Sequence, residues 1–528
     1  MILSVSLSNV YLFAHKYGDL SIDFFVQNPQ IFRDYSFRYS VFPILFFLLV
    51  LTIVFFAIRL NLVRFLSAIS LFVCTWSVAQ GAYNSVRIYR GFQNTENLAE
   101  FYDEEGKIEP VYHLSKEKPN VIVLFLDRGI GSFVPHIFEE LPEVKKQFDG
   151  FTYFPNCVSF STATITGSPA MSGGYEYTQE KMNERTNELL RDTHNEALLA
   201  VPRTFANAGF SASLTNPPWP NYLLTGESLL TKNADIAQIW TQGKYAEKYK
   251  REIKFFEKKI KNLDERVRKE IRNFSILQSL PPFFRLSFNG LCRSRRAEGG
   301  TGAFINNISS LHYLGECVDF SAKSGTFTYI CTDVAHDVST FLSESCDVPA
   351  MSAPHLSEYC SKMDDFTKMH YQANVAAFKE FGRFFDFLKK SGVWDNSRIV
   401  IVSDHGFDLR IPEFQHFSKP REPGRYAALL LEKDFGENGE LKTSHDFMTN
   451  ADAVLFEISG LDVPAENPFT HVPWKAEKEG GVDVWECDDW NPNNIQNDKT
   501  FVLDKKRAYH ISTDIFDEKK WIPLSEWR

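Results

Sequence analysis

The sequence predicts an α/β fold in which a mostly parallel central sheet is flanked by helices and preceded by a transmembrane helical hairpin. Residues 120–126 and 398–402 are short, continuous apolar runs, typical of strands buried on both faces of a parallel sheet. Residues 378–392 repeat phenylalanine at helical spacing and end at a glycine, which predicts an amphipathic helix. Two longer uncharged apolar runs, 41–58 and 65–83, come before these elements.

The two long apolar runs predict a membrane hairpin over residues 41–83. Residues 41–58 contain no charged side chain over nearly the ~20 positions that a helix needs to cross a bilayer. Residues 65–83 are less apolar but also uncharged, and only a short connection separates them from the first run. The alternative is a buried hairpin of a soluble core. Arginines flank both runs on each side, so the positive-inside rule gives no orientation.

The rest of the chain divides by composition. Residues 84–118 are polar and mixed, which predicts a linker that leaves the membrane. Residues 119–470 contain the predicted strands and helices of a soluble catalytic domain. The tryptophan-rich residues 471–528 predict a small cap or tail of strands and loops. Residues 1–40 mix polar and aromatic side chains and have no clear assignment.

Charge and cysteine usage exclude some classes of protein. The net charge of −10 over 528 residues argues against nucleic-acid binding, because a phosphate backbone requires a basic surface. The eight cysteines contain no CxxC pair, which disfavours a structural zinc site built from thiolates. Cys346 and Cys360 bracket a loop-like stretch and would be able to form a disulfide in an extracytoplasmic domain.

Polar side chains follow both predicted strands where the strands end. Asp127 comes directly after the first, and Asp404 and His405 follow the second. Ligands of open α/β sheets bind beyond the carboxyl ends of the strands, so we expect these three side chains to lie at one edge. Their oxygen and nitrogen donors suit a divalent metal, Zn²⁺ or Mn²⁺.

Residues 158–174, VSFSTATITGSPAMSGG, form an uncharged run rich in hydroxyl groups. They predict either a solvated loop or a nucleophile at a helix N-terminus, where free amides hold a phosphate. A threonine hydroxyl is protonated at neutral pH, and a bound divalent cation is the natural means of activating it. In an extended segment Thr162, Thr164 and Thr166 point to the same side, so alternation does not choose between them.

The position of the proline favours one of the three threonines. Pro169 is typical of a first helical turn, so we expect the phosphate-holding amides around residues 167–171. Thr166 would then belong to the turn or cap, and Thr162 would lie further back toward the incoming loop. Thr164 is left as the favoured nucleophile, with the other two as rivals.

The order strand–Asp, hydroxyl run, strand–SDHG resembles the alkaline phosphatase and sulfatase superfamily. Within it, the chain resembles the membrane-anchored lipoteichoic acid synthases and phosphoethanolamine transferases. The resemblance covers about residues 119–465, and SDHG is its sharpest motif. It implies an alkaline phosphatase-like sheet, a metal centre formed by Asp127, Thr164, Asp404 and His405, and Thr164 as the nucleophile.

The same resemblance implies three substrate-binding histidines. His336 follows a strand-like stretch, YICTDVAHD, similar to the family strand that ends in a histidine facing the substrate. His416 lies shortly after SDHG, near the position of a second substrate or metal histidine in phosphoethanolamine transferases. His445 precedes a stretch similar to the family's closing helix and is a weaker candidate.

The chain departs from these families in three ways. The lipoteichoic acid and phosphoethanolamine enzymes have Glu where this chain has Asp127, which puts the metal preference in doubt. The sulfatase motif C/S-x-P-x-R is absent from TGSPAMSG, which disfavours a true sulfatase. The hydroxyl run also lacks the cysteine pair that brackets the nucleophile of phosphoethanolamine transferases.

The sequence therefore predicts a metal-dependent phosphotransferase in the cell membrane, multi-pass, with an extracytoplasmic catalytic domain. It would move phosphoethanolamine or phosphoglycerol from a phospholipid donor to a surface glycan or lipid acceptor through a phosphothreonine, without a nucleic-acid partner. The alternative is a phosphate or sulfate ester hydrolase on the same fold. From a different class, a catalytically silent membrane scaffold is disfavoured because all four metal-centre residues are present.

Overall fold

The chain divides into two compact units. The first contains α3 (Phe37–Arg59) and α4 (Val63–Ala99), and the second comprises Glu109–Glu257 together with Arg296–Arg528. The computed structural model describes residues 37–99, 108–222, 235–254, 299–336, 338, 340–350, 357–418, 421–486, 495–496 and 499–527.

The helices of the first unit give one membrane-spanning candidate. Within the described residues, Val63–Tyr83 is long and apolar enough to cross a bilayer, whereas Leu48–Arg59 is a shorter apolar stretch. The expected hairpin of two spans therefore stays a prediction. α4 also continues to Ala99, past residue 83, where we expected a linker to begin. No proline interrupts the helix in this stretch.

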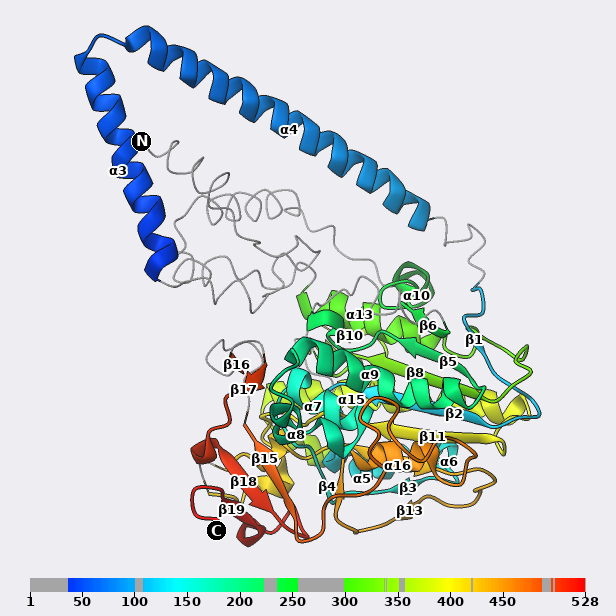
Figure 1. The fold of residues 1–528 in the computed structure, drawn as a ribbon. Helices are drawn as coiled ribbons and strands as arrows, with labels where there is room; N and C mark the ends of the chain where they lie inside the picture. The colour runs from blue at the N-terminus through cyan, green and yellow to red at the C-terminus, as the bar shows by residue number, and fades with distance from the viewer. Residues whose placement is uncertain are drawn as a thin grey trace. The chain divides into compact units, whose positions relative to one another are not determined.

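The second unit is built on an eight-stranded sheet with the order β13-β3-β12-β11-β2-β8-β5-β6 (Figure 1). Both predicted strands are found: β2 spans Asn120–Leu126, and β11 spans Ser397–Val402. β2 lies between β11 and β8 (Thr326–Thr332) and is parallel to both. β12 is antiparallel to its neighbours β11 and β3, so the sheet is mostly parallel, as expected. The remaining strands of the sheet are β13 (Lys442–Thr443), β3 (Thr152–Tyr153), β12 (Leu430–Lys433), β5 (Ser211–Thr215) and β6 (Ile236–Ile239).

All seven residues of β2 are buried, as expected of a strand covered on both faces. Alternate side chains of this strand, Val121, Val123 and Phe125, belong to one core cluster. Side chains from three helices complete that cluster, including Met171 and Phe205. The three helices are α7 (Thr164–Gly173), α9 (Leu190–Asn207) and α16 (Asp452–Ile458).

α15 (Asp365–Lys390) contains the predicted phenylalanine face and packs into an aromatic cluster. Phe385 is fully buried, and its ring centroid lies 5.0 Å from that of Phe148. The helix ends two residues before Gly392, close to the predicted stop, but begins well before residue 378. Its N-cap is Asp364, whose side chain accepts a hydrogen bond from the Thr367 amide. α5 (Val134–Glu140) and α6 (Pro142–Gln147) precede this cluster along the chain.

The predicted C-terminal cap contains a three-stranded antiparallel sheet formed by β15, β18 and β19. Contacts place it in the same compact unit as the large sheet. The bounds of these strands are Val482–Trp485, Ala508–Ile511 and Trp521–Pro523. The smaller helices are α8 (Gln179–Glu184), α10 (Ala246–Glu252), α13 (Gly299–His312) and α14 (Glu358–Ser361). Short strand pairs are β1 (Tyr112–His113) with β7 (Val318–Asp319), β4 (Cys157–Val158) with β14 (Met448–Thr449), β9 (Phe341–Leu342) with β10 (Pro349–Ala350) and β16 (Ile495–Gln496) with β17 (Thr500–Phe501).

The disulfide that Cys346 and Cys360 would be able to form is absent. Both are free, buried thiols, the first in a turn after β9 and the second in α14. Burial raises the pKa of Cys346 to about 12 and that of Cys360 to about 11, so both remain protonated at neutral pH. Their separation in sequence did not establish a geometry that allows a bond.

The aromatic cluster yields a stability prediction. Phe385→Ala removes a fully buried ring that also contacts Trp394, so we expect a loss of about 3–5 kcal/mol in the free energy of unfolding. Urea unfolding of the detergent-solubilised protein, followed by tryptophan fluorescence, measures it. The control is Phe366→Ala on the same helix, where the ring is 41% exposed and the expected loss is below about 1 kcal/mol. Equal losses for the two variants would contradict the difference in burial between Phe385 and Phe366.

Candidate active site

The register of β2 and β11 brings the two predicted aspartates together. Phe125 pairs with Val402, and each aspartate lies two residues beyond its own strand partner. Ligand atoms of Asp127, Asp404 and His405 all lie within 4.8 Å of one another. All three side chains are buried, with Asp127 only 4% exposed. The structure therefore gathers the three metal-ligand candidates at one sheet edge.

Hydrogen bonds fix the orientation of His405 and Asp404. The His405 Nδ1–H donates to the Gly406 carbonyl, which leaves the Nε2 lone pair facing Asp404 Oδ2 at 3.3 Å. Asp404 Oδ1 accepts from the His405 amide at 2.9 Å, while Oδ2 accepts no hydrogen bond from the described part of the chain. Burial lowers the pKa of His405, against the opposing effect of Asp404, so its ring is uncharged at neutral pH.

These donors fit a divalent cation. A buried carboxylate oxygen and an imidazole lone pair repel when they face each other, unless a positive charge lies between them. Two carboxylates and one imidazole are a donor set that binds Zn²⁺ or Mn²⁺. The metal identity stays a prediction.

Thr164 is the first residue of α7 and completes the cluster. Its hydroxyl lies 3.4 Å from Asp127 Oδ2 and 3.3 Å from His405 Nε2. The side chain is 2% exposed. The hydroxyl thus lies at a helix N-terminus and among the candidate metal ligands at the same time.

α7 begins earlier in the chain than we predicted from the position of Pro169. Pro169 lies inside α7 and not in its first turn, so the amides of residues 167–171 are not the free first-turn donors that we expected. The Gly167 amide, for example, already donates to the Ala163 carbonyl at 2.7 Å. The N-terminal amides of the helix instead lie at Thr164 and immediately after it.

The two rival threonines have other contacts. The Thr166 hydroxyl lies 2.6 Å from Ser161 Oγ and donates to the Ala163 carbonyl at 3.1 Å, so it belongs to the helix start as expected. The Thr162 hydroxyl accepts from Arg425 Nη2 at 3.4 Å. The Thr164 hydroxyl, in contrast, contacts two of the metal-ligand candidates, Asp127 and His405.

A close backbone approach holds α7 against the SDHG segment. A Cβ added at Gly167 would lie 2.7 Å from the Asp404 carbonyl oxygen, a distance that side chains do not tolerate. The same carbonyl accepts hydrogen bonds from Ser159 Oγ and, at 2.8 Å, from Asn450 Nδ2. These contacts position the nucleophile helix and the second aspartate relative to each other.

The three predicted substrate histidines are not part of the donor cluster. His336 is half-buried beyond the end of β8, and its carbonyl accepts from Arg128 Nη1 at 3.0 Å. His416 is exposed, and its Nε2–H donates to the Phe516 carbonyl at 3.1 Å in the C-terminal cap. His445 is exposed in the connection between β13 and β14. Their roles at the substrate stay predictions.

Sequence reasoning missed two arginines near the cluster. Arg128 directly follows Asp127, and its amide lies 3.4 Å from Asp404 Oδ1. Arg425 contacts the hydroxyl run through Thr162. The charge of each lowers the pKa of His405. The first was visible in the sequence as the cation of LDRG, whereas the second comes from a loop that only the fold brings here.

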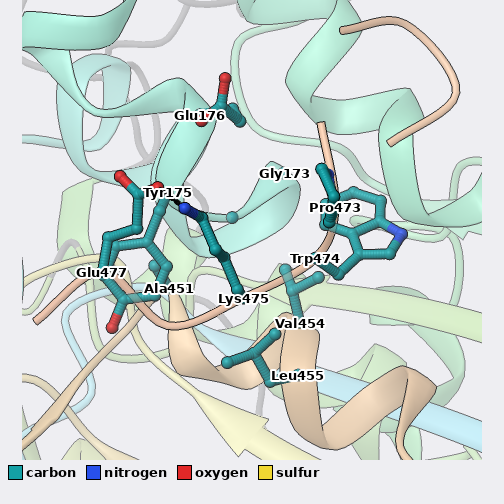
Figure 2. A pocket seen from close by; sticks show the side chains of 11 residues that line it. Gly173, Tyr175, Glu176, Ala451, Val454, Leu455, Pro473, Trp474, Lys475 and Glu477 are labelled. Atoms are coloured by element: carbon teal, nitrogen blue, oxygen red, sulfur yellow. Dashed lines mark ion pairs between the residues drawn. The ribbon is translucent and has the colours of Figure 1, made fainter. Parts of the chain in front are cut away.

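A separate hollow lies at the other end of α7. It is lined by Gly173, Trp474, Lys475 and residues of α16 (Figure 2). Lys475 pairs with Glu477 at 3.1 Å on its rim. Because α7 has ten residues, at a rise of about 1.5 Å each, this hollow is more than about 10 Å from Thr164. It is therefore not part of the candidate active site.

Comparison with known proteins gives similarities in fold. No family model and no curated protein matches the sequence. Solved structures do. The chain is similar to the lipoteichoic acid synthase LtaP from Listeria monocytogenes, at 12% identity over 76% of this chain and 86% of that one, with a TM-score of 0.37. It is also similar to a protein in the alkaline phosphatase superfamily from Vibrio parahaemolyticus, at 12% identity over 79% and 84%, with a TM-score of 0.38.

A phosphonate monoester hydrolase of Agrobacterium radiobacter is similar at 13% identity over 66% of this chain and 74% of that one, with a TM-score of 0.35. These similarities in fold are to proteins of the superfamily that the sequence motifs resemble. At these identities and TM-scores, nothing about substrate or reaction follows from the similarities, and function rests on the site.

The donor cluster yields a metal-binding prediction. Asp404→Asn replaces a charged ligand by a neutral amide, so we expect the purified protein to retain less than about a tenth of the wild-type zinc or manganese affinity. Metal analysis after equilibrium dialysis measures it. Asp446→Asn is the control, because Asp446 is exposed and bonded to Ser444 away from the cluster. Unchanged affinity in Asp404→Asn would rule out this cluster as the metal site.

A buried histidine beside the site predicts a pH dependence of stability. His370 is 1% exposed and stacks on Phe407, and burial, reinforced by the charge of Arg128, lowers its pKa to about 3. The unfolded state takes up a proton below pH ~6.5, whereas the folded state does not. Stability therefore falls by up to about 1.4 kcal/mol per pH unit from pH ~6.5 down to about 3.

His370→Phe keeps a stacked ring without the titrating group. We expect a shallower loss of unfolding free energy between pH 6.5 and 4 in this variant, measured by urea titrations at each pH. His445→Phe, at an exposed position, serves as control and should keep the wild-type slope. A wild-type slope in His370→Phe would show that His370 is not the source.

Proposed function

We propose that the chain is a membrane-anchored, metal-dependent phosphotransferase that moves a phospholipid headgroup phosphate to a surface glycan or lipid. The observation that supports it is the placement of Thr164: a buried hydroxyl at a helix N-terminus, 3.4 Å and 3.3 Å from two candidate metal ligands. A structural threonine in a solvated loop would have neither the burial nor these neighbours.

In the first half-reaction, Thr164 Oγ forms a bond to phosphorus while the bond from phosphorus to the diacylglycerol oxygen breaks. The threonine proton ends on the diacylglycerol hydroxyl, and the headgroup phosphate is a diester of Thr164. A hydroxyl of the acceptor then displaces Thr164, which regains a proton. Both halves exchange one P–O bond for another, so no oxidant or reductant is needed.

The residues around Thr164 would each contribute to this exchange. A bound zinc or manganese ion would lower the pKa of the hydroxyl and neutralise charge on phosphoryl oxygens. The N-terminus of α7, where Thr164 lies, would favour the negative charge of the phosphoryl group. His405 is held with Nε2 unprotonated, toward the hydroxyl. His336, His416 and His445 are proposed to orient the headgroup or the acceptor.

The membrane segments fit a lipid donor. Val63–Tyr83 can cross a bilayer by length and composition, and would keep the catalytic unit at the membrane surface where the phospholipid is found. The proposal includes the second span before it and an extracytoplasmic catalytic domain. In a hydrolase on the same site, water would take the place of the acceptor hydroxyl in the second half-reaction.

Mass spectrometry of the full-length protein tests the proposal. After incubation with phosphatidylethanolamine or phosphatidylglycerol in detergent, we expect the peptide containing Thr164 to gain the mass of one headgroup phosphate. Thr164→Ala should lose this adduct and at least about 10³-fold in diacylglycerol release, because the attacking atom is gone. Thr162→Ala and Thr166→Ala are matched controls within the same segment and should keep the adduct.

The outcomes separate the candidates. Diacylglycerol release that accelerates with a glycan or glycolipid acceptor supports transfer. Release that is fast without any acceptor supports the hydrolase. If Thr164→Ala keeps full activity while a neighbouring threonine variant is dead, the nucleophile is misassigned. If wild-type protein releases nothing from either lipid, the proposed donor is wrong.

A further inference from the structure

Arg128 has an unusual backbone conformation beside the candidate active site. Its φ is 56°, in the left-handed region that arginine rarely adopts. Strain of this kind persists where the surrounding structure imposes it, and it occurs often at functional sites. Here it turns the chain immediately after Asp127 and aims the side chain across the end of the sheet.

Neutral groups hold the guanidinium. Nη1 donates to the His336 carbonyl at 3.0 Å, and the guanidinium carbon lies 4.2 Å from the centre of the Phe407 ring. His370 stacks on the same ring and is uncharged at neutral pH, because burial lowers its pKa to about 3. A carbonyl, an aromatic ring and a neutral imidazole thus position Arg128 without cancelling its charge.

Arg128 makes no ion pair with any described residue, although its side chain is half-buried, and its Nε–H donates to no described acceptor. The other arginines near this edge are paired. Arg425 lies 2.9 Å from Glu486, and Arg421 lies 3.0 Å from Glu518. Removing a guanidinium from water without a counter-ion costs free energy that an incoming anion would recover.

The charges of the site indicate what that anion is. The carboxylates of Asp127 and Asp404 together balance one divalent cation. The positive charge of Arg128 is then left over. An ester that carries a single negative charge neutralises it, whereas a doubly charged phosphate monoester leaves an excess negative charge in a buried site.

We infer that Arg128 binds a non-bridging oxygen of the substrate, and that the site thereby favours singly charged esters, phosphodiesters above all, over doubly charged phosphate monoesters. This inference rests on the proposed function for the identity of the ester. The anion-binding role of Arg128 stands on the geometry alone. The guanidinium offers Nε and its remaining N–H groups to the oxygen while Nη1 stays on His336.

Arg128→Asn tests the inference without disturbing the backbone, because asparagine tolerates a positive φ and carries no charge. Calorimetry on full-length, metal-loaded protein in detergent measures the affinity for inorganic sulfate, a doubly charged anion that needs no turnover. This measurement tests the anion-binding role of Arg128 alone, and the preference for singly charged esters is tested by turnover. We expect a loss of about tenfold or more in Arg128→Asn and a smaller loss in Arg128→Lys, which keeps the charge without the planar fork. Arg421→Asn is the matched control, with similar burial but a carboxylate partner, and should bind sulfate as the wild type does.

Turnover supplies the second readout. The two substrates are bis(p-nitrophenyl) phosphate, a singly charged diester, and p-nitrophenyl phosphate, a monoester that is doubly charged at pH 8. The wild type should have the higher kcat/KM for the diester. In Arg128→Asn the ratio of the two kcat/KM values should fall by about tenfold, because the KM for the diester rises. Wild-type sulfate affinity in Arg128→Asn, with unchanged metal content, would overturn the inference. If the wild-type protein cleaves neither ester but binds sulfate in a way that depends on Arg128, the proposed function is wrong. The anion-binding role of Arg128 then still holds. If Arg128→Asn does not fold, Arg128→Lys provides the test. The inference is overturned if Arg128→Lys binds sulfate as tightly as the wild type and keeps the same preference for the diester.

Discussion

The parallel pairing of β2 with β11 is the constraint on which the site depends. Its register places Phe125 opposite Val402, so that Asp127 and Asp404 emerge side by side at the same edge. Neighbouring strands lie about 4.8 Å apart, which forces two carboxylates into close proximity in a buried environment. Such a pair is unfavourable unless a positive charge is shared between them. The sheet therefore creates a site that favours a bound cation, and the other elements of the site surround this pair of carboxylates.

The elements of this edge were predictable to different degrees. Residues 120–126 and 398–402 read as strands because burial on both faces demands continuous apolar runs, and the structure places strands at Asn120–Leu126 and Ser397–Val402. Given two such strands, the rule that ligands bind beyond the carboxyl ends of parallel strands was enough to predict that Asp127 and Asp404 lie close together. The start of α7 did not follow. Pro169 favours a first turn on average, but contacts with the SDHG segment start the helix at Thr164, before the proline.

Features that depend on distant parts of the chain were beyond sequence reasoning. His416 was placed near the substrate by its distance from SDHG, yet its ring bonds to the Phe516 carbonyl, about a hundred residues further on. Arg128 directly follows Asp127 in the sequence, but its significance comes from its backbone conformation and from the groups around its guanidinium. Local pattern gives the type of an element and seldom its partners, because the partners are set by the packing of the whole unit.

The C-terminal residues show what this packing does for the site. We expected residues 471–528 to form a small cap or tail, and their side chains contact the loops that follow SDHG. Glu486 pairs with Arg425 at 2.9 Å, and Arg425 in turn contacts the Thr162 hydroxyl in the segment that precedes the nucleophile.

A second link runs from Glu518 to the same loop. Its carboxylate accepts from the Ser418 amide at 3.0 Å and pairs with Arg421 at 3.0 Å. A third runs from the Thr513 carbonyl, which accepts from Asn156 Nδ2 at 2.6 Å just before the hydroxyl run. The cap thus holds both the loop after His405 and the segment before Thr164. Since these two segments carry a metal-ligand candidate and the nucleophile candidate, the small sheet is a structural part of the catalytic unit, and the distance between the two groups depends on it.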